Sequence, residues 1–405
     1  MRWILVVTLF TFSVPLFGQP ADQCCPQLER FTVLLENDLF RVVPRTHADR
    51  YYTGGGKIEA SYSHTPWLDK LTLLGADSYR INPFFSWGFT TFTPRGLRGP
   101  TIDYNDRPYA GYSFFSLGKE RLSKSLVYSQ RTELFVGFMG ANAPGKLQNF
   151  THQYITPAAP HVVGWDSTWD VASQRSRKPL AISYSRSGSG LYARTQPVAN
   201  GKYEWAQVWL TSNLTLGNYL TAGTLGTRFN LINLNNPEPT LGRGNPQFGA
   251  DYNTIPKIFL PEKLRSLFKL TDRSLVATKH DNMMQNKEAQ SSRVPCASFS
   301  FYVHPRIRAY AWNASLQWQE GSPHYFTADE LNFIQFETTI GFLARYRGWQ
   351  AGYTWNLRTA EFKAHPNGFD TWGGIFISRL IDWRSVVTIP NSPIIPHNDD
   401  EAVER

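Results

Sequence analysis

Short segments in which apolar and polar residues strictly alternate recur along the chain, and they constrain the fold more than any other feature. In residues 57–63, Ile58 and Ala60 share one side of an extended chain, and polar or charged residues occupy the other. Residues 205–216 and 334–342 alternate in the same way. A period of two is that of a β-strand that separates an apolar from a polar surface, whereas a helix repeats every 3.6 residues. The pattern predicts an all-β fold.

Twelve such segments can be counted, and an even number of strands is what bacterial transmembrane barrels have. We therefore predict an antiparallel transmembrane β-barrel of about twelve strands. The predicted strands lie near residues 31–38, 54–63, 82–93, 109–120, 127–138, 179–186, 204–216, 218–231, 297–316, 332–345, 347–358 and 371–380.

The composition favours the same fold. Charged residues make up 18% of the chain, below the roughly 25% of soluble proteins, and aromatic residues reach 15%. A membrane barrel needs few charges because one side of each strand meets lipid, and it places aromatic residues at both interfaces. No later segment has 18 consecutive apolar residues, which argues against membrane-spanning helices. The alternative is a secreted β-sandwich, but twelve strands with this aromatic content exceed a usual sandwich.

The N-terminus indicates export. Arg2 is followed by an apolar run from Trp3 to Phe17, and Gly18-Gln19-Pro20 then ends it, as in a signal-peptide cleavage region. The alternative is a membrane anchor, but fifteen apolar residues are short of the about 20 that a spanning helix needs. We expect a bacterial outer-membrane location. The expected divisions are 1–19 signal peptide, 20–385 barrel with long extracellular loops, and 386–405 polar C-terminal tail.

The lengths of the connections suggest an orientation, because outer-membrane barrels have short periplasmic turns and long extracellular loops. With both termini in the periplasm, we expect the loops 39–53, 94–108 and 139–178 at the extracellular rim. Loop 232–296 is assigned to the same rim because of its length, with a short amphipathic helix at 260–270. The short connections lie near 121–126, 217 and 346.

The net charge of +9 comes from scattered Lys and Arg residues. Without a basic stripe that is interleaved with aromatic residues, we expect no nucleic-acid partner. A basic surface on an exported protein suits anionic partners such as phosphorylated glycolipids. Cys24, Cys25 and Cys296 form neither a disulfide framework nor a metal-binding spacing, and a single long-range disulfide stays open.

Polar residues that interrupt the alternation gather at the ends of the predicted strands in the first 165 residues. The main motifs are Glu36-Asn37-Asp38-Leu39-Phe40, Asp49-Arg50-Tyr51-Tyr52-Thr53-Gly54, Asp106-Arg107-Pro108-Tyr109-Ala110-Gly111, and the loop from Gly140 through Gln148 and His152 to Gly164-Trp165. In this order they resemble the outer-membrane lipid A 3'-O-deacylases. Downstream, only the general barrel pattern is recognisable.

The resemblance implies an esterase that removes an acyl chain from lipid A, or lipopolysaccharide, in the outer leaflet with the help of Ca²⁺. His152 would be the general base for an attacking water, which suits a side chain that titrates near neutral pH. Asp38 would be an oxygen ligand of the hard Ca²⁺ cation, which polarises the ester carbonyl. Asn37 and Thr53 would complete the site. The resemblance places this site on the outside of the barrel wall, and we expect a membrane-embedded monomer.

Two positions depart from the family pattern. No lysine stands in the loop before the fourth strand, where the family has a basic residue for a lipid A phosphate, so Arg98, or alternatively Arg95, is assigned this role. Arg107 is a second candidate for a substrate contact, alternatively a structural residue of the rim. The residues shortly after His152 include no acidic side chain, and Asp166 is the alternative candidate for orienting the histidine.

Two other functions stay open. A non-enzymatic pore or binding barrel of the same fold predicts an open polar lumen, and a barrel phospholipase predicts cleavage of ordinary phospholipids. One geometric condition applies to the esterase. Adjacent residues of a regular strand point to opposite sides, so Asn37 and Asp38 can serve one site only at a bulge or at the end of the strand.

Overall fold

The structure is a computed structural model that describes residues 28–40, 51–62, 80–95, 103–122, 128–140, 145, 146, 148, 150, 180–194, 203–234, 297–317, 324–346 and 348–381. Strands dominate this part of the chain. They are β1 (Leu28–Asn37), β2 (Tyr51–Tyr62), β3 (Arg80–Thr93), β4 (Ala110–Leu122), β5 (Tyr128–Met139), β6 (Leu180–Arg194), β7 (Tyr203–Gly217), β8 (Leu220–Leu234), β9 (Ala297–Asn313), β10 (Ile334–Tyr346), β11 (Trp349–Thr359) and β12 (Phe369–Leu380). The named helices are η1 (Asp38–Phe40), α8 (Ala314–Gln317) and η2 (Ala328–Glu330).

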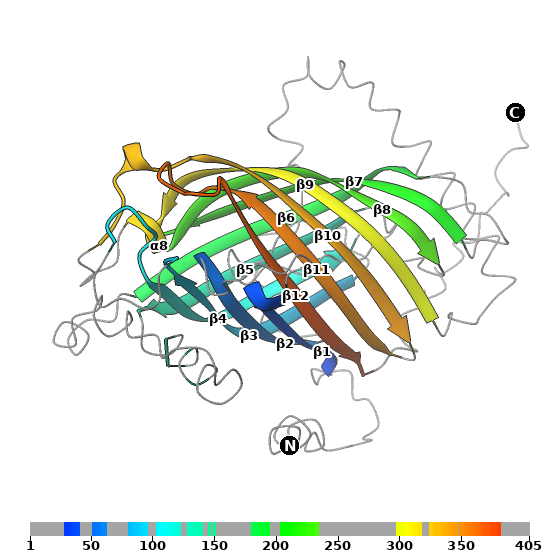
Figure 1. Ribbon diagram of the computed structural model, residues 1–405. Coiled ribbons are helices and arrows are strands. Elements are labelled where there is room, and N and C mark those ends of the chain that lie inside the picture. The colour runs from blue at the N-terminus through cyan, green and yellow to red at the C-terminus, as the bar shows by residue number, and fades with distance from the viewer. Residues whose placement is uncertain are drawn as a thin grey trace, which may run out of the picture.

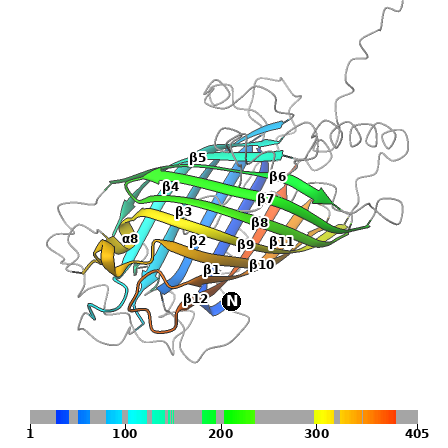
Figure 2. The same cartoon turned by 90° about the horizontal axis from the view of Figure 1, so that it is seen from above.

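The twelve strands form one closed barrel in which each strand pairs antiparallel with its neighbours in sequence (Figure 1). The barrel closes where β1 pairs with β12, from Arg30 opposite Leu380 to Asn37 opposite Gly373. Figure 2 shows the same inclined strands from above. Closure leaves no free edge, so every strand has partners on both sides. The predicted twelve-stranded antiparallel barrel is confirmed.

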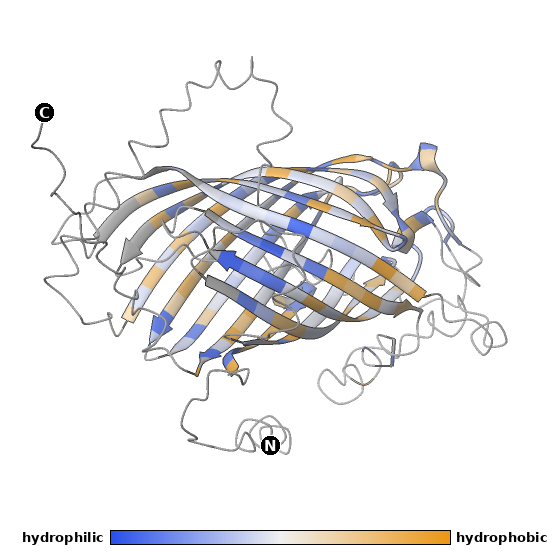
Figure 3. Cartoon of the chain, turned by 180° about the vertical axis from the view of Figure 1, so that it is seen from behind, coloured by the Kyte–Doolittle hydropathy of each residue, from blue (hydrophilic) through white to orange (hydrophobic). Residues whose placement is uncertain are grey.

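The wall of the barrel separates an apolar outside from a polar inside. Large apolar side chains such as Leu35, Ile58 and Phe115 are exposed, whereas alternate positions such as Glu59 and Ser116 are buried. Bands of hydrophobic and hydrophilic residues accordingly alternate along the strands in Figure 3. This is the inverse of a soluble protein and follows from lipid as the outer solvent. None of the helices in the described residues is long and apolar enough to cross a membrane.

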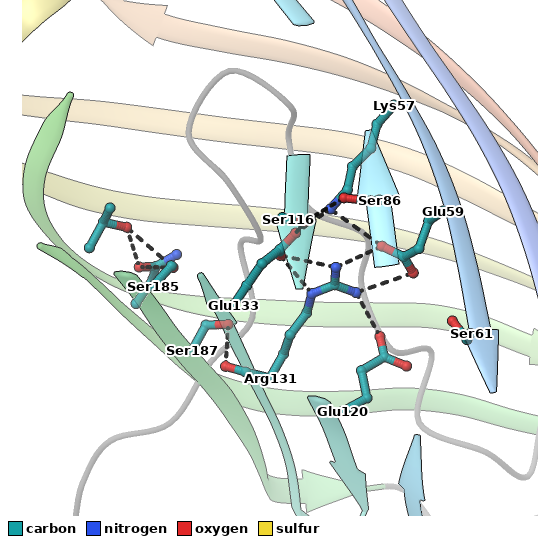
Figure 4. A network of polar contacts seen from close by, with 12 residues as sticks. Lys57, Glu59, Ser61, Ser86, Ser116, Glu120, Arg131, Glu133, Ser185 and Ser187 are labelled. Carbon is teal, nitrogen blue, oxygen red and sulfur yellow. Dashed lines mark hydrogen bonds and ion pairs between the residues drawn. The ribbon is translucent and has the colours of Figure 1, made fainter. Parts of the chain in front are cut away.

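Charged side chains meet inside the lumen in a cluster that we call the lumen network, made of Arg30, Lys57, Glu59, Glu120, Arg131 and Glu133. Figure 4 labels all of these residues except Arg30. Arg131 is its centre, with guanidinium nitrogens 2.6 Å from a Glu59 carboxylate oxygen, 3.1 Å from Glu120 and 3.0 Å from Glu133. The guanidinium also lies 3.5 Å from the centroid of the Phe84 ring. Three cations balance three carboxylates, which a buried cluster requires to offset the loss of hydration.

A second group of residues lies at the end of the barrel opposite the start of β1 and the end of β12, and we call it the far end. Here the segments 103–109, 314–317, 324–333 and 360–368 connect strands, and Leu331 forms a β-bridge with Phe362 between two of them. An apolar cluster holds these segments together, made of Tyr51, Leu316, Phe326, Leu331 and Phe362. We call this assembly the loop plug, since its side chains are buried against one another at the mouth of the lumen.

The far end also carries Arg358, which is fully buried beneath the loop plug. Its guanidinium lies 3.1 Å from a carboxylate oxygen of Glu361 and 3.1 Å from one of Asp370. Asp370 accepts a second contact from His365 Nε2 at 2.9 Å. Ion pairs therefore support the loop plug from below, as they fill the lumen deeper in the barrel.

One prediction about the connections is wrong. Even-numbered strands end at the end of the barrel where β1 begins, so β8 ends and β9 begins there (Figure 1). Loop 232–296 therefore does not start from the far end, which carries the other long loops of the predicted extracellular rim. The short connection at 217 joins β7 to β8 at the far end instead. In a meander the direction of the chain alternates from strand to strand, so the number of a strand, and not the length of the loop after it, decides at which end that loop lies. The predicted helix at 260–270 lies outside the described residues, whereas the short helix α8 is at the far end.

A second correction concerns the end of the strand predicted near 179–186, which Ser187-Gly188-Ser189-Gly190 directly follow. These residues instead continue β6, with Ser187 opposite Arg131 of β5 and Asn213 of β7. Small side chains suit this stretch because the large Arg131 occupies the neighbouring lumen. Register on both sides, rather than intrinsic turn preference, decides the structure here.

Candidate functional site

The predicted site residues Asn37 and Asp38 lie where β1 ends. Along β1 the exposed Leu35 points outward, the buried Glu36 points into the lumen, and Asn37 has the outward position. The strand stops at Asn37, and Asp38 begins the 3-10 helix η1. Asp38 is therefore released from the alternation of the strand, which meets the geometric condition for both residues to serve one site.

Thr53 reaches the same side of the wall through a β-bulge. The pairing of β2 with β3 shifts register between Tyr52 and Gly54, so Thr53 is the extra residue. Its hydroxyl lies 2.5 Å from that of Thr93, which shares the outward side of β3 with the exposed Trp87. Asn37, Thr53 and Thr93 thus form a polar patch on the outward side of the wall, near exposed apolar side chains such as Leu35, and we call it the outer-wall patch.

Glycine makes room for this patch. Gly54 pairs with Asn37 across β1 and β2, and a Cβ atom at Gly54 would lie 3.1 Å from Asn37 Nδ2 and 3.0 Å from the carbonyl oxygen of Glu36. Both distances are tighter than ordinary van der Waals contact. The missing side chain therefore lets the Asn37 amide lie flat against the neighbouring strand.

On the lumen side of the same strands, aromatic side chains pack beneath the outer-wall patch. Tyr52 donates a hydrogen bond of 2.6 Å from its hydroxyl to Glu36 Oε2, and its ring packs edge-on against Trp372. The preceding Tyr51 has a φ of 61° and lies with its ring centroid 4.2 Å from that of His365. A positive φ is costly for a bulky residue and persists only where packing enforces it. The backbone that leads into Thr53 is thus fixed from the lumen side.

Arg107 does not lie with these residues. Its side chain is buried beneath the loop plug, where it stacks 4.0 Å from the Phe92 ring centroid, donates a 2.7 Å hydrogen bond to Ser315 and pairs with Glu361. The carboxylate of Asp106 accepts from the backbone N–H groups of Arg95 and Arg107 at 2.7 and 2.8 Å. These contacts fit the structural alternative for Arg107, a residue that fixes the rim, and give it no accessible surface for substrate.

His152, Arg98 and Asp166 lie outside the described residues. Gln148, from the same predicted loop as His152, is described and buried, and Arg95 is exposed. Among the residues that the structure describes, no group of three or more His, Cys, Asp or Glu side chains is placed to hold a metal.

The chemistry of the donors near Asp38 nevertheless suits Ca²⁺. The described side chains of Asn37, Asp38 and Thr53 offer an amide, a carboxylate and a hydroxyl oxygen, and the 3-10 turn adds backbone carbonyls. Ca²⁺ takes six to eight oxygen ligands and accepts carbonyls as readily as carboxylates. A site with one carboxylate therefore fits this ion better than a metal that prefers nitrogen or sulfur.

Two residues near η1 could not be found from the sequence. Tyr353 of β11 donates a hydrogen bond to the carbonyl oxygen of Phe40, and Gly373 of β12 lies directly beneath the Phe40 backbone. Both are more than 300 positions away along the chain and lie in strands that show only the ordinary barrel alternation.

A closed, even-numbered barrel with a lipid-facing apolar wall and a polar lumen defines an integral outer-membrane protein, and here it also carries a polar patch on the outside. The family model described as "Outer membrane protein LpxR" matches residues 4–380, and the chain belongs to this family. This confirms the resemblance to the outer-membrane lipid A 3'-O-deacylases and the bacterial outer-membrane location.

One solved structure supports the fold. LpxR from Salmonella typhimurium is similar over 87% of this chain and 99% of that chain, with a TM-score of 0.58 and 16% identity. The β domain of the Bordetella autotransporter BrkA aligns over 87% of this chain and 98% of that chain, but with a TM-score of only 0.37 and 7% identity. A search of curated proteins gives no match.

Proposed function

We propose that this protein is a Ca²⁺-dependent esterase that removes an ester-linked acyl chain from lipid A in the outer leaflet. The observation that carries the proposal is the outer-wall patch. Polar side chains on the lipid-facing side of the wall are costly unless they are used, yet Asn37 and Thr53 lie on that side at the far end of β1 and β2, where Thr53 and the neighbouring Asp38 are buried. Membership of the LpxR family supports the same substrate.

In the proposed reaction the chain's own groups position the ester and move one proton. His152 accepts a proton from water on a ring nitrogen, so that the water oxygen attacks the ester carbonyl carbon. The same imidazolium then returns the proton to the departing sugar oxygen, which releases a free fatty acid. Ca²⁺, when bound, supplies the positive charge that polarises the carbonyl. Asp38 would hold the ion, and Asn37 and Thr53 would orient the substrate through their amide and hydroxyl.

The decisive experiment is mass spectrometry of lipid A from cells that express the wild-type chain or His152→Ala, each with calcium and with a chelator. The expected result is loss of one acyl mass in the wild type alone and only with calcium. Folded barrel must be shown in each membrane by its altered mobility on unheated gels. An unchanged lipid A profile with folded wild-type barrel would contradict the proposal.

A mixed-substrate assay separates the phospholipase alternative. Purified barrel is given lipid A and a glycerophospholipid together in the presence of calcium, and the released fatty acids are identified by chain length and hydroxylation. The deacylase releases only chains that come from lipid A. Release from the glycerophospholipid alone would assign the protein to the phospholipases.

A further inference from the structure

The 3-10 helix η1, which carries Asp38, lies on the outside of the barrel and packs against β12 and β2. Its closest approach is at Gly373 of β12, where a Cβ atom would collide with the carbonyl group of Phe40. Gly373 is opposite Asn37 in the pairing of β12 with β1, so it has the outward side of its strand. Only glycine permits the backbone of η1 to cross the wall at this height.

Tyr353 fixes η1 from the next strand. It has an outward position on β11 between the exposed Ala351 and the half-buried Trp355, and it pairs with the outward Ile375 of β12. Its hydroxyl donates a hydrogen bond to the carbonyl oxygen of Phe40. A phenol hydroxyl that faces lipid needs such a partner, because lipid provides none. The bond therefore satisfies the tyrosine and holds the end of η1 against the wall.

We propose that Tyr353 and Gly373 are positioning residues that hold η1 on the outer wall and thereby set the place of Asp38. The inference rests on the proposed function, in which Asp38 binds Ca²⁺. Gly373 sets the height of η1 above β12, and Tyr353 prevents the 3-10 turn from lifting away. Neither residue touches the reacting atoms.

The test uses full-length barrel in detergent with the variant Tyr353→Phe, which removes one hydroxyl. Tyr346→Phe is the matched control, since Tyr346 is an exposed, outward tyrosine of β10. The first measurement is amide hydrogen exchange of the peptide around residues 36–41 without calcium, which Tyr353→Phe should accelerate and Tyr346→Phe should not. The second is the calcium concentration for half-maximal deacylation, which should rise by up to about tenfold, the equivalent of one lost hydrogen bond. The rate at saturating calcium should stay near that of the wild type.

Gly373→Ala provides a second test, because the added Cβ collides with the Phe40 carbonyl oxygen, the acceptor of the Tyr353 hydrogen bond, and must displace η1 while the Tyr353 hydroxyl is kept. Gly223→Ala is its control, since a Cβ at Gly223 meets nothing within 4 Å. Unchanged exchange around 36–41 in both Tyr353→Phe and Gly373→Ala would overturn the inference. Absence of deacylation by the wild-type barrel would instead overturn the proposed function, and the exchange data distinguish the two failures because they need no activity.

Discussion

Glu36 and Asn37 are consecutive residues on opposite sides of the barrel wall, and their surroundings differ in kind. Glu36 faces the lumen and accepts a 2.6 Å hydrogen bond from Tyr52. Asn37 faces outward beside Gly54, on a wall where the neighbouring Leu35 and Ile58 meet lipid. In the described lumen, charged side chains such as those around Arg131 pair with one another, whereas Asn37 lies beside Thr53 in the outer-wall patch, among apolar neighbours. Polarity inside thus stabilises the barrel, and polarity outside indicates function.

The largest effect should follow from breaking the lumen network. Arg131→Met leaves Glu59, Glu120 and Glu133 without their shared cation, and removal of one partner from a buried ion cluster costs about 3–5 kcal/mol. We expect a lower free energy of unfolding in urea, measured in lipid vesicles by tryptophan fluorescence. The fraction that remains folded should keep its deacylase activity. Full stability of Arg131→Met would show that the lumen charges do not support the barrel.

The next largest effect should come from the outer side of the wall, where a change at Asp38 can be compared with one at Glu36 in the lumen. Asp38→Asn removes the proposed calcium carboxylate, and polarisation of a carbonyl by a metal is worth several kcal/mol, so deacylation should fall by roughly 100-fold or more. Glu36→Gln makes the same chemical change two residues away on the lumen side and should leave deacylation intact. The measurement is the initial rate of fatty acid release at fixed calcium. Equal losses in both variants would erase the distinction between the two sides of the wall.

A smaller effect should follow from crowding Asn37 without changing it. Gly54→Ala places a Cβ 3.1 Å from Asn37 Nδ2, so the amide must move by a few tenths of an ångström. We expect a several-fold loss of activity, about 1 kcal/mol in barrier height, with the barrel still folded. Gly190→Ala, where a Cβ meets nothing within 4 Å, is the control. Gly54→Ala with wild-type activity would show that the place of Asn37 is not critical.

The smallest effect concerns the loop plug, which responds to pH through His324. This side chain packs between Tyr104 and Phe326, and burial lowers the pKa of His324 below its ordinary value of 6.5. The folded state therefore favours the neutral imidazole, and its contribution to stability is complete above pH 6.5 and is lost as the pH falls toward the lower folded pKa. The protection factor for hydrogen exchange of residues 324–333, which is the observed rate corrected for the intrinsic base-catalysed rate at each pH, should be lower at pH 5.5 than at pH 7.5. In His324→Gln this pH dependence should shrink, and an unaltered dependence would assign it to another group.

Much of the barrel could be predicted from the sequence, because lipid outside and a polar lumen inside require apolar and polar residues to alternate along each strand. The twelve strands were predicted within a few residues of their observed positions, except at the C-terminal end of β6, where Ser187–Gly190 resembles a turn but pairs on both sides. The predicted side of the membrane for loop 232–296 was wrong, because the length of a loop is a weaker guide to its side than the number of strands that precede it.

The candidate site could be predicted only in part. Asn37 and Asp38 stand out in sequence because a polar run ends an alternating strand, and the structure places them at that end. The contacts of Arg107 with Ser315 and Glu361 could not be foreseen, since they join loops more than 200 residues apart. Tyr353 is hidden for the same reason, because its role depends on closure of the barrel rather than on its neighbours in sequence.

The pairing of β1 with β12 links the position of Asp38 to closure of the barrel. Asp38 directly follows the first strand of the barrel, but η1 rests on Tyr353 and Gly373, which belong to the last two strands. A barrel that lacks β12 has no such support. The position of the proposed calcium carboxylate therefore depends on closure of the barrel between its first and last strands.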